Sequence, residues 1–338
     1  MTGVLLASAA GAAALLAGSP ALVASVGGPE DAPAYLAVHA AAALGTFEAE
    51  GVRVTLRRAK HAAAAIDALR EDEAAVAVTT ADQAVRGAWA RGTPVRILVA
   101  HTRAPAVVLL VSAKHRDRVV RVEDLRGTRV GIPGPGTTGH LVLAALLRAR
   151  RIEPWQLELL SFGGTTLMAR LGSGELAAAA LEEPWATRAV AAGVGSVLVD
   201  VRRAEDATRQ LGGPFYEVVS VARADERELA ALEPALGAYV RAVIRVQAWL
   251  AAAPPAEIAD RLSPRLVRDR DRFVAWLGAV QSAYSPDGDA TEAGLATTLA
   301  VLRAGSPWPV TLKITPQALR EPPFLTAVRA GLNPGSRP

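Results

Sequence analysis

The chain has 338 residues, of which 51% are hydrophobic but only 4% aromatic, and its formal net charge is +4. It contains no cysteine, which excludes disulfides, thiolate catalysis, iron–sulfur clusters and cysteine-based zinc sites. The basic residues are almost all arginines scattered among acidic ones, without basic runs interleaved with aromatics, so nucleic-acid binding is not favoured. A chain of this length accommodates two domains of ordinary size.

Residues 1–19 are expected to be an export signal. Residues 4–18 form an apolar run rich in alanine and glycine, which resembles the hydrophobic region of such a signal and is short for a membrane span. The basic segment that normally precedes this region is missing, because the first lysine or arginine is Arg53. A start codon assigned too late would explain this, and a buried first helix is the alternative interpretation.

Strand and helix patterns then alternate in two sets, which predicts two mostly parallel α/β sheets with helices on both faces. The strands expected in the first set are 21–26, 52–56, 74–79 and 95–100, and the helices are 35–44, 62–70 and 82–91. The strands expected in the second set are 129–132, 157–162, 176–181 and 196–201, and the helices are 137–150, 165–171 and 184–192. Residues 69–92 and 171–193 share one local pattern, an acidic turn, a buried strand, a polar cluster and a helix.

Two apolar runs rich in β-branched residues, 106–112 and 215–222, follow the first and the second set. We expect them to be a pair of hinge strands, one leading into a second lobe and one returning from it. From residue 226 the pattern is almost entirely helical. The expected division is a first lobe of residues 20–108 with 219–338, including the C-terminal helices, and a second lobe of residues 109–218.

A glycine-rich turn joins the strand at 129–132 to the helix that begins near Thr137. Backbone N–H groups at a helix start lack intrahelical partners and lie at the positive end of the helix dipole. Gly134, Gly136 and Gly139 remove side chains that would keep a ligand away. The turn is therefore expected to hold an anionic or strongly polar group, and a plain tight turn without a ligand is the alternative.

The same turn has the formal spacing G-x-G-x-x-G of a dinucleotide-binding unit. The following strand, 157–162, runs into the sequence SFGG rather than ending near an acidic residue for the ribose, and Glu158 lies inside it. The motif also lies in the middle of the chain rather than in a first βαβ unit. A nucleotide is therefore disfavoured, and no cofactor is expected.

In open parallel sheets, ligands lie beyond the carboxyl ends of the strands, and two facing lobes would bring these ends into one cleft. The residues expected to bind the ligand there are Asp31, Tyr35, Lys60, Thr79, Thr80, His101, Gly136, Thr137, Thr138, Gly139, His140, Glu183 and Trp185. Structural roles are the alternative for several of them, as helix caps, a core tryptophan or a surface lysine. The apolar strand before Glu182 and Glu183 indicates that one of this pair faces the cleft.

Catalytic and metal-binding motifs have little support in the sequence. It contains no G-x-S-x-G, H-E-x-x-H or phosphate-loop lysine motif. The five histidines show no metal-ligand spacing. The sequence therefore predicts neither catalytic residues nor a metal site, and it favours a binding role over an enzymatic one.

Several motifs occur in the order LGTFEAEGVRV (44–54), VEDLRGTRVGI (122–132), GTTGH (136–140) and LEEPW (181–185), followed by C-terminal stretches at 284–305 and 324–332. Together they resemble the type II periplasmic binding proteins of ABC importers, in the group that binds nitrate, sulfonate and taurine and includes thiamine-pyrimidine-synthase-like domains. The resemblance extends over nearly the whole chain after about residue 20. It implies two lobes, each a mostly parallel sheet flanked by helices, joined by two hinge strands.

The resemblance also implies site residues. In this family the turn before the helix of the second lobe commonly binds an anionic head group, and a polar pair and an acidic-proline-aromatic step also lie at the site. The corresponding residues are, in that order, Gly136 to Gly139, Thr79 with Thr80, and Glu183 to Trp185. The alanine-rich helix before LGTF departs from the usual family pattern. The resemblance therefore does not determine the first lobe's half of the pocket or the ligand.

We therefore expect an exported, extracytoplasmic solute-binding protein. It would close its lobes on a small anionic or polar ligand, sulfonate-, nitrate-, taurine- or pyrimidine-like, and deliver it to the permease and ATPase subunits of an importer. It would act as a monomer, bind no nucleic acid and meet the membrane only through the permease. The alternatives are an enzyme on the same fold, of the thiamine-pyrimidine or menaquinone-pathway type, and a ligand sensor detached from transport.

Overall fold

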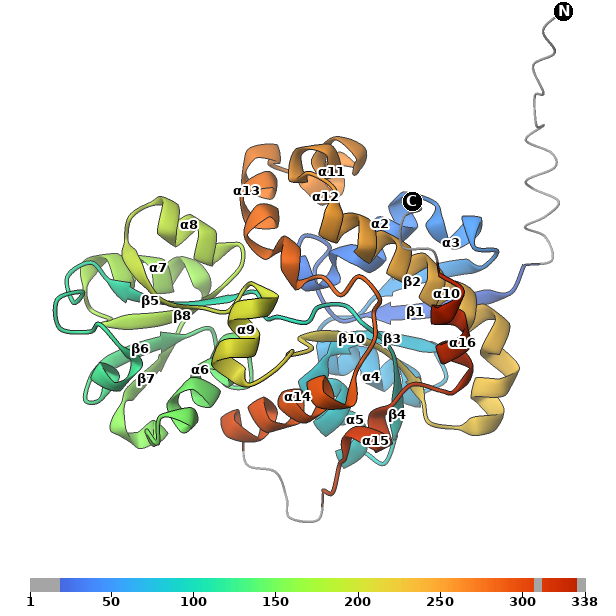
Figure 1. The fold of residues 1–338 in the computed structure, drawn as a ribbon, viewed down its shortest axis with the longest axis horizontal. Helices are drawn as coiled ribbons and strands as arrows, with labels where there is room; N and C mark the ends of the chain where they lie inside the picture. Colours follow the sequence, from blue (N-terminus) through green and yellow to red (C-terminus); the bar gives the residue numbers. More distant parts are fainter. Residues whose placement is uncertain (1–18, 307–311, 333–338) are drawn as a thin grey trace, which may run out of the picture.

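The computed structural model describes residues 19–306 and 312–332, so the predicted export signal lies outside the described residues except for its last position. Two five-stranded sheets form two lobes that lie side by side (Figure 1). The prediction of a two-lobed α/β fold is confirmed. Within the described ranges, none of the helices combines the length and the apolarity that a bilayer crossing requires.

Lobe 1 is built on a sheet with the strand order β2-β1-β3-β10-β4. Its strands are β1 (Ala21–Val26), β2 (Arg53–Arg58), β3 (Val76–Thr80), β4 (Val95–Ala100) and β10 (Val218–Arg223). β1 pairs in parallel with β2 and β3, whereas β10 runs antiparallel to both of its neighbours, β3 and β4. β3 is buried except at Thr80, as expected of a central strand covered on both faces.

Lobe 2 repeats this arrangement with the order β7-β6-β8-β5-β9. Its strands are β5 (Val107–Ser112), β6 (Arg129–Ile132), β7 (Glu158–Ser161), β8 (Ala178–Glu182) and β9 (Gly195–Asp200). β6 pairs in parallel with β7 and β8, and β5 runs antiparallel to β8 and β9. Each sheet therefore has one reversed strand among strands of a common direction, in agreement with the mostly parallel prediction.

The two reversed strands are the predicted hinge strands. β5 follows lobe 1 along the chain but lies inside the sheet of lobe 2, and β10 follows lobe 2 but lies inside the sheet of lobe 1. The chain passes between the lobes just before each strand, at residues 101–106 and 212–217, which we call the first and second crossings. Because both strands are almost fully buried in their sheets, the place where the chain can bend lies in the crossings rather than in the strands.

Helices cover both faces of each sheet, as predicted, with apolar clusters on each side. Those that precede the first crossing are α2 (Leu36–Ala43), α3 (Thr46–Ala49), α4 (Ala62–Arg70) and α5 (Ala88–Ala90). Those between the crossings are α6 (Thr138–Ala149), α7 (Gly164–Ser173), α8 (Trp185–Ala191) and α9 (Ala204–Leu211). Those after the second crossing are α10 (Glu226–Ala252), α11 (Pro255–Arg261), α12 (Pro264–Val267), α13 (Arg270–Val280), α14 (Glu292–Gly305), α15 (Pro316–Leu319) and α16 (Phe324–Ala330).

Some predicted helices differ in detail. The helix expected at 82–91 is a π-helical turn, η2 (Gln83–Gly87), followed by the short α5, and α9 occupies a segment to which the sequence pattern assigned no element. Within the region expected to be helical from residue 226, the separate elements α12, α13 and η5 (Gln281–Ala283) follow one another. The remaining short turns are η1 (Pro33–Tyr35), η3 (Val122–Leu125) and η4 (Pro154–Gln156).

Helix α14 contacts both lobes. Its Leu295 and Leu299 belong to an apolar cluster with β4 and β10 of lobe 1, and Leu141 of α6 in lobe 2 belongs to the same cluster. The end of α14 lies so close to α6 that a Cβ added at Gly305 would be 2.5 Å from Leu141 Cδ2. α14 thus joins the two lobes at the lower edge of the molecule in Figure 1, on the side away from α13.

Candidate functional site

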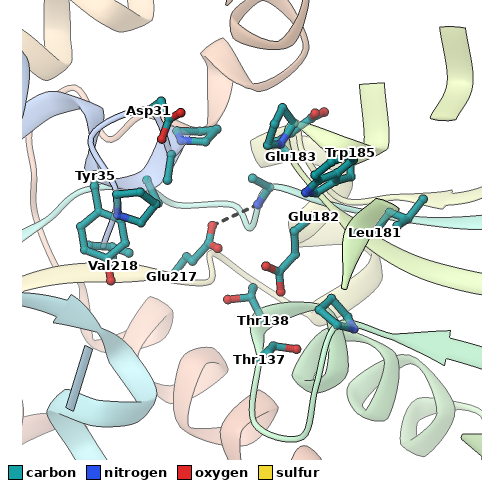
Figure 2. Close-up of a pocket in the computed structure, with 18 of the residues that line it drawn as sticks. Asp31, Tyr35, Thr137, Thr138, Leu181, Glu182, Glu183, Trp185, Glu217 and Val218 are labelled. Atoms are coloured by element: carbon teal, nitrogen blue, oxygen red, sulfur yellow. Dashed lines mark hydrogen bonds between the residues drawn. The ribbon is translucent and has the colours of Figure 1, made fainter. Parts of the chain in front are cut away.

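A cavity of about 450 Å³ lies between the two lobes, a volume within the usual range of small-molecule sites. Its walls come from the loop after β1, the ends of β3 and β8, the starts of α6 and α7, and the two crossings (Figure 2). This is the edge at which open α/β sheets bind ligands. The predicted site residues that line it are Asp31, Tyr35, Thr80, Thr137, Thr138, Glu183 and Trp185.

The two aromatic residues of the cavity each lie against a glycine. A Cβ added at Gly28 would come within 2.1 Å of the Tyr35 ring, and a Cβ added at Gly164 would come within 2.4 Å of the Trp185 ring. Real Cβ atoms do not make contacts this short, so only glycine lets the backbone reach the ring faces at these positions. The Arg188 guanidinium lies 4.4 Å from the centre of the Trp185 ring. Both aromatic walls are therefore held by close packing.

At the start of α6, the N–H groups of Gly139 and His140 are bound by protein groups. Thr137 is the N-cap, and its hydroxyl accepts a hydrogen bond from His140 N–H at 3.4 Å and donates one to Gly134 O at 2.8 Å. Gly139 N–H donates to Glu182 Oε1 at 2.7 Å. The sequence predicted a ligand's anionic group at this turn, but the structure has a protein carboxylate there, because the end of β8 lies directly opposite the helix start.

Glu217 enters the cavity from the second crossing and joins three parts of the molecule. Its Oε2 accepts a hydrogen bond from Ala106 N–H of the first crossing at 3.1 Å (Figure 2). An interaction with the Thr138 hydroxyl of lobe 2 favours the charged form of this carboxyl group and so opposes a rise of its pKa. Burial, and secondarily the nearby Glu182, raise the pKa of Glu217 to about 7. Burial also raises the pKa of Glu182, and the Gly139 hydrogen bond opposes that shift.

Glu183 has a different environment from its neighbour Glu182. Its carboxylate forms an ion pair with Arg202 at 2.6 Å and accepts hydrogen bonds from the Thr187 hydroxyl at 2.7 Å and from Thr187 N–H at 3.1 Å. Arg202 is held in turn by Asp200. Figure 2 shows Glu182 pointing toward Thr138 and Glu183 pointing away from it. The Glu183 oxygens are therefore already bound within lobe 2, and Glu182 is the member of the pair whose carboxyl group faces the middle of the cavity.

Six of the predicted site residues do not line the cavity: Lys60, Thr79, His101, Gly136, Gly139 and His140. Lys60 follows β2, an edge strand remote from the central β3, and its side chain is exposed. Thr79 points to the face of β3 opposite to that of Thr80, because strand residues alternate, and its hydroxyl donates to Ala62 O at 2.8 Å. Gly136 N–H donates to His140 Nδ1 at 3.1 Å, so the turn closes on itself.

His101 is a core residue of lobe 1 rather than a cleft residue. It follows β4, the other edge strand, and is fully buried. Its Nε2 lies 2.8 Å from Ser220 Oγ, which lies 2.8 Å from the Tyr239 hydroxyl. Burial lowers the pKa of His101 to about 3, so the ring is neutral and serves as an internal hydrogen-bond partner.

The sequence interpretation did not include Glu217 among the site residues. It included Glu183, which lines the cavity, but not Glu182, whose carboxyl group faces the middle of the cavity. Glu217 is an acidic residue within the otherwise apolar run FYEVVSVA, and a charge in such a run is a signal that could have indicated a site. Glu182 and Glu183 could be told apart only from the pairing of β8, which places Glu182 at the end of the strand.

The ionisable side chains that line the cavity are acidic. Among the described residues, the cavity is lined by Asp31, Glu182, Glu183 and Glu217, and by no arginine, lysine or histidine. The same described ranges contain no group of three or more histidine or acidic residues arranged to hold a metal ion. The arrangement can accept hydrogen bonds from a bound molecule and can stabilise positive charge on it.

Known proteins share this fold. A protein from Bordetella bronchiseptica RB50 is 23% identical, with a TM-score of 0.73 over 92% of this chain and 97% of that one. The periplasmic nitrate-binding protein NrtA from Synechocystis PCC 6803 is 15% identical, with a TM-score of 0.64 over 93% and 89% of the two chains. The alkanesulfonate-binding protein SsuA from Xanthomonas axonopodis pv. citri, bound to MOPS, is 14% identical, with a TM-score of 0.62 over 89% and 98%.

At the level of sequence, no curated protein matches the chain. A family model described as NMT1/THI5 like matches residues 32–223, which is more than half of the 338 residues. The match includes η1, both crossings, β3, β8 and the start of α6, and so the whole cavity lining except Pro29 and Asp31. The chain belongs to the NMT1/THI5-like family.

Proposed function

We propose that this protein is the extracytoplasmic solute-binding component of an ABC importer, which closes two lobes on a small polar ligand and delivers it to the permease and ATPase subunits. The observation that carries the proposal is the cavity of about 450 Å³ whose wall is shared by both lobes and both crossings. A ligand bound there contacts each lobe, so binding favours the closed arrangement. The similar structures include an alkanesulfonate-binding and a nitrate-binding protein, which supports the same role.

The moving units are close to those expected from the sequence, residues 20–108 with 219–338 and residues 109–218, with the boundaries moved to just before β5 and just before β10. Hinge motion places the backbone change in a few residues at the ends of elements, and the crossings meet this description. They are tied together where Phe215 N–H donates to Arg103 O at 3.1 Å and where Ala106 N–H donates to Glu217. Rotation of the lobes would bend both crossings as one unit.

A ligand screen with two readouts tests this proposal. A ligand at 100 times its dissociation constant stabilises the folded state by about 2.7 kcal/mol, which a thermal-shift assay detects. Small-angle scattering with the same compound should show a smaller radius of gyration. If no polar metabolite raises the melting temperature and the radius never changes, the binding role is wrong. Consumption of a bound compound on incubation would instead support the enzyme alternative.

Export and partners are tested separately. We expect the mature protein outside the cytoplasm as a monomer, and we expect transport of the ligand to stop when genes for a permease and an ATPase are deleted. N-terminal sequencing of the native protein would show whether residues 1–19 are removed. A full-length protein in the cytoplasm would contradict the importer role and leave the ligand-binding site to a sensor.

A further inference from the structure

Two carboxyl groups in the cavity lack a positive partner. Glu182 at the end of β8 and Glu217 in the second crossing both line the cavity (Figure 2). The other two acidic residues of the lining, Asp31 and Glu183, are paired with arginines at 3.3 and 2.6 Å. No cationic side chain lines the cavity within the described residues. The middle of the cavity therefore holds two carboxyl groups with no cationic side chain beside them.

An anionic ligand is disfavoured by the same groups. The Gly139 N–H at the start of α6, which would otherwise bind an anion, donates to Glu182 at 2.7 Å. A sulfonate or nitrate at this place would have to displace that carboxylate and then lie beside it and beside Glu217. Like charges repel strongly where water is largely excluded.

The cavity also contains an unused hydrogen-bonding group. Tyr35 is only 6% exposed and lines the cavity, and no hydrogen bond to its hydroxyl is present among the described residues. The Tyr35 hydroxyl is not one of the fully buried polar atoms that lack a partner in the described residues, so water or a ligand can satisfy it. Tyr35 therefore offers a ligand one more hydrogen-bonding group in addition to the two carboxyl groups.

We propose, as an extension of the solute-binding role, that the ligand is an organic cation whose ammonium, amidinium or guanidinium N–H groups lie between Glu182 and Glu217. A carboxylate has about four acceptor positions, and the protein hydrogen bonds to these two groups leave some of them available to the cation. The apolar part of the ligand packs between Tyr35 and Trp185, the two rings held against glycine backbone. Charge-assisted hydrogen bonds of this kind are stronger than neutral ones.

Binding of named probes tests the charge class. The cations are agmatine, putrescine and benzamidine, the anions are ethanesulfonate and nitrate, the zwitterion is taurine, and the uncharged ligands are cytosine and uracil. Isothermal titration calorimetry and thermal shift of the full chain at pH 7.5 measure each one. We expect at least one cation to bind and the anions to leave the melting temperature unchanged.

Two isosteric substitutions then locate the cation. Glu182→Gln and Glu217→Gln each keep an oxygen that can accept the Gly139 or Ala106 hydrogen bond but remove one negative charge. Losing a charge-assisted hydrogen bond should weaken binding of the cation roughly 10- to 150-fold. The matched control is Glu158→Gln, an exposed carboxylate on β7 paired with Arg129 at 3.0 Å, which should leave affinity unchanged.

Proton exchange gives a second readout that needs no variant. The ionisable groups that face Glu217 are Glu182, Tyr35 and Tyr284, and burial keeps both tyrosines neutral at pH 7. Because the pKa of Glu217 is raised to about 7, part of the unliganded protein holds a proton that a bound cation should displace. Titration in phosphate and in Tris should therefore show proton release on binding.

The outcomes separate this inference from the proposed function. If an anion or an uncharged probe binds, causes compaction and keeps its affinity in both glutamine variants, solute binding stands and the cation class is wrong. Proton uptake on binding, or cation affinity that neither variant changes, also overturns the cation class. If no probe of any charge binds or changes the scattering radius, the solute-binding role itself fails, and the inference fails with it.

Discussion

The two lobes have the same strand order but give the cavity different walls. In both, the last residue of the central strand reaches the cavity, Thr80 from β3 in lobe 1 and Glu182 from β8 in lobe 2. The next residue is Ala81 in lobe 1, whereas in lobe 2 it is Glu183, which is tied to Arg202. A shared backbone topology thus positions equivalent sites, and the side chains at those sites decide what each lobe contributes.

The two lobes differ in how firmly the protein holds the polar groups that line the cavity. In lobe 2, Glu182 and Thr137 already make hydrogen bonds within the protein, so their positions are fixed before a ligand arrives. In lobe 1, the Tyr35 hydroxyl has no such partner among the described residues, and Thr80 only caps the following turn by accepting from Gln83 N–H at 3.4 Å. Lobe 2 presents preorganised charge, and lobe 1 presents a mostly apolar cover.

The largest expected effect comes from breaking the fixed network of lobe 2. Glu183→Ala removes a fully buried carboxylate and leaves Arg202, whose side chain is 12% exposed, with Asp200 alone. We expect the free energy of unfolding to fall by about 3–5 kcal/mol, as for other broken buried pairs, measured by urea denaturation. Glu182→Gln, one residue away, is the control and should change stability far less. Equal losses for the two variants would contradict the different roles assigned to them.

The next effect concerns Glu217, which lies between the lobes. Its pKa rises on folding from 4.5 to about 7, so the folded state binds this proton more tightly than the unfolded state does. The contribution of this group to the free energy of unfolding is present below about pH 4.5 and is lost as the pH rises to 7. At roughly 1.4 kcal/mol per pKa unit, the free energy of unfolding falls by about 3 kcal/mol over this range.

Denaturation curves from pH 4 to pH 8 measure this contribution. The free energy of unfolding should fall more steeply with pH in the wild type than in Glu217→Gln, and the variant should be the more stable of the two at pH 8. Other carboxylates add slopes of their own, but these are common to both proteins and cancel in the difference. Parallel curves for the two proteins would show that burial does not raise the pKa of Glu217.

The smallest expected effect compares the glycines that support the two aromatic rings. Gly28→Ala should cost about 1–3 kcal/mol because the buried Tyr35 ring has no room to move. Gly164→Ala should cost less than about 1 kcal/mol, because the half-buried Trp185 can shift, although ligand affinity should fall. Gly163→Ala is the control, since a Cβ there meets no atom within 4 Å. A larger loss for Gly164→Ala than for Gly28→Ala would contradict the expectation that Tyr35 has less room to move than Trp185.

The sequence allowed the fold to be predicted because its signals are local. Strand and helix periodicity placed nearly every element within a few residues, including both reversed strands. The polar α9 lacks a long apolar stripe, with Ala207 as its one buried residue, and so was not predicted.

The site was only partly predictable because it depends on pairing between distant segments. Lys60 and His101 follow strands just as Thr80 does, and only the strand order places their strands at opposite edges of the sheet. Thr79 and Thr80 differ only in which face of β3 they occupy. No local pattern brings Glu217 beside Glu182, because that contact requires β10 to enter the sheet of lobe 1 and β8 to lie at the centre of lobe 2.

The position of β10 also sets an order of assembly. β3 and β4 are not neighbours in their sheet, so neither can complete its ladder before residues 218–223 are available to pair between them. The sheet of lobe 2 draws all its strands from residues 107–200 and can close while the sheet of lobe 1 still has a gap between β3 and β4. In a chain that emerges from its N-terminus, the half that is synthesised first therefore finishes folding last. The apolar strand faces of lobe 1 therefore need protection from aggregation for longer than those of lobe 2, which is inserted within lobe 1 along the chain.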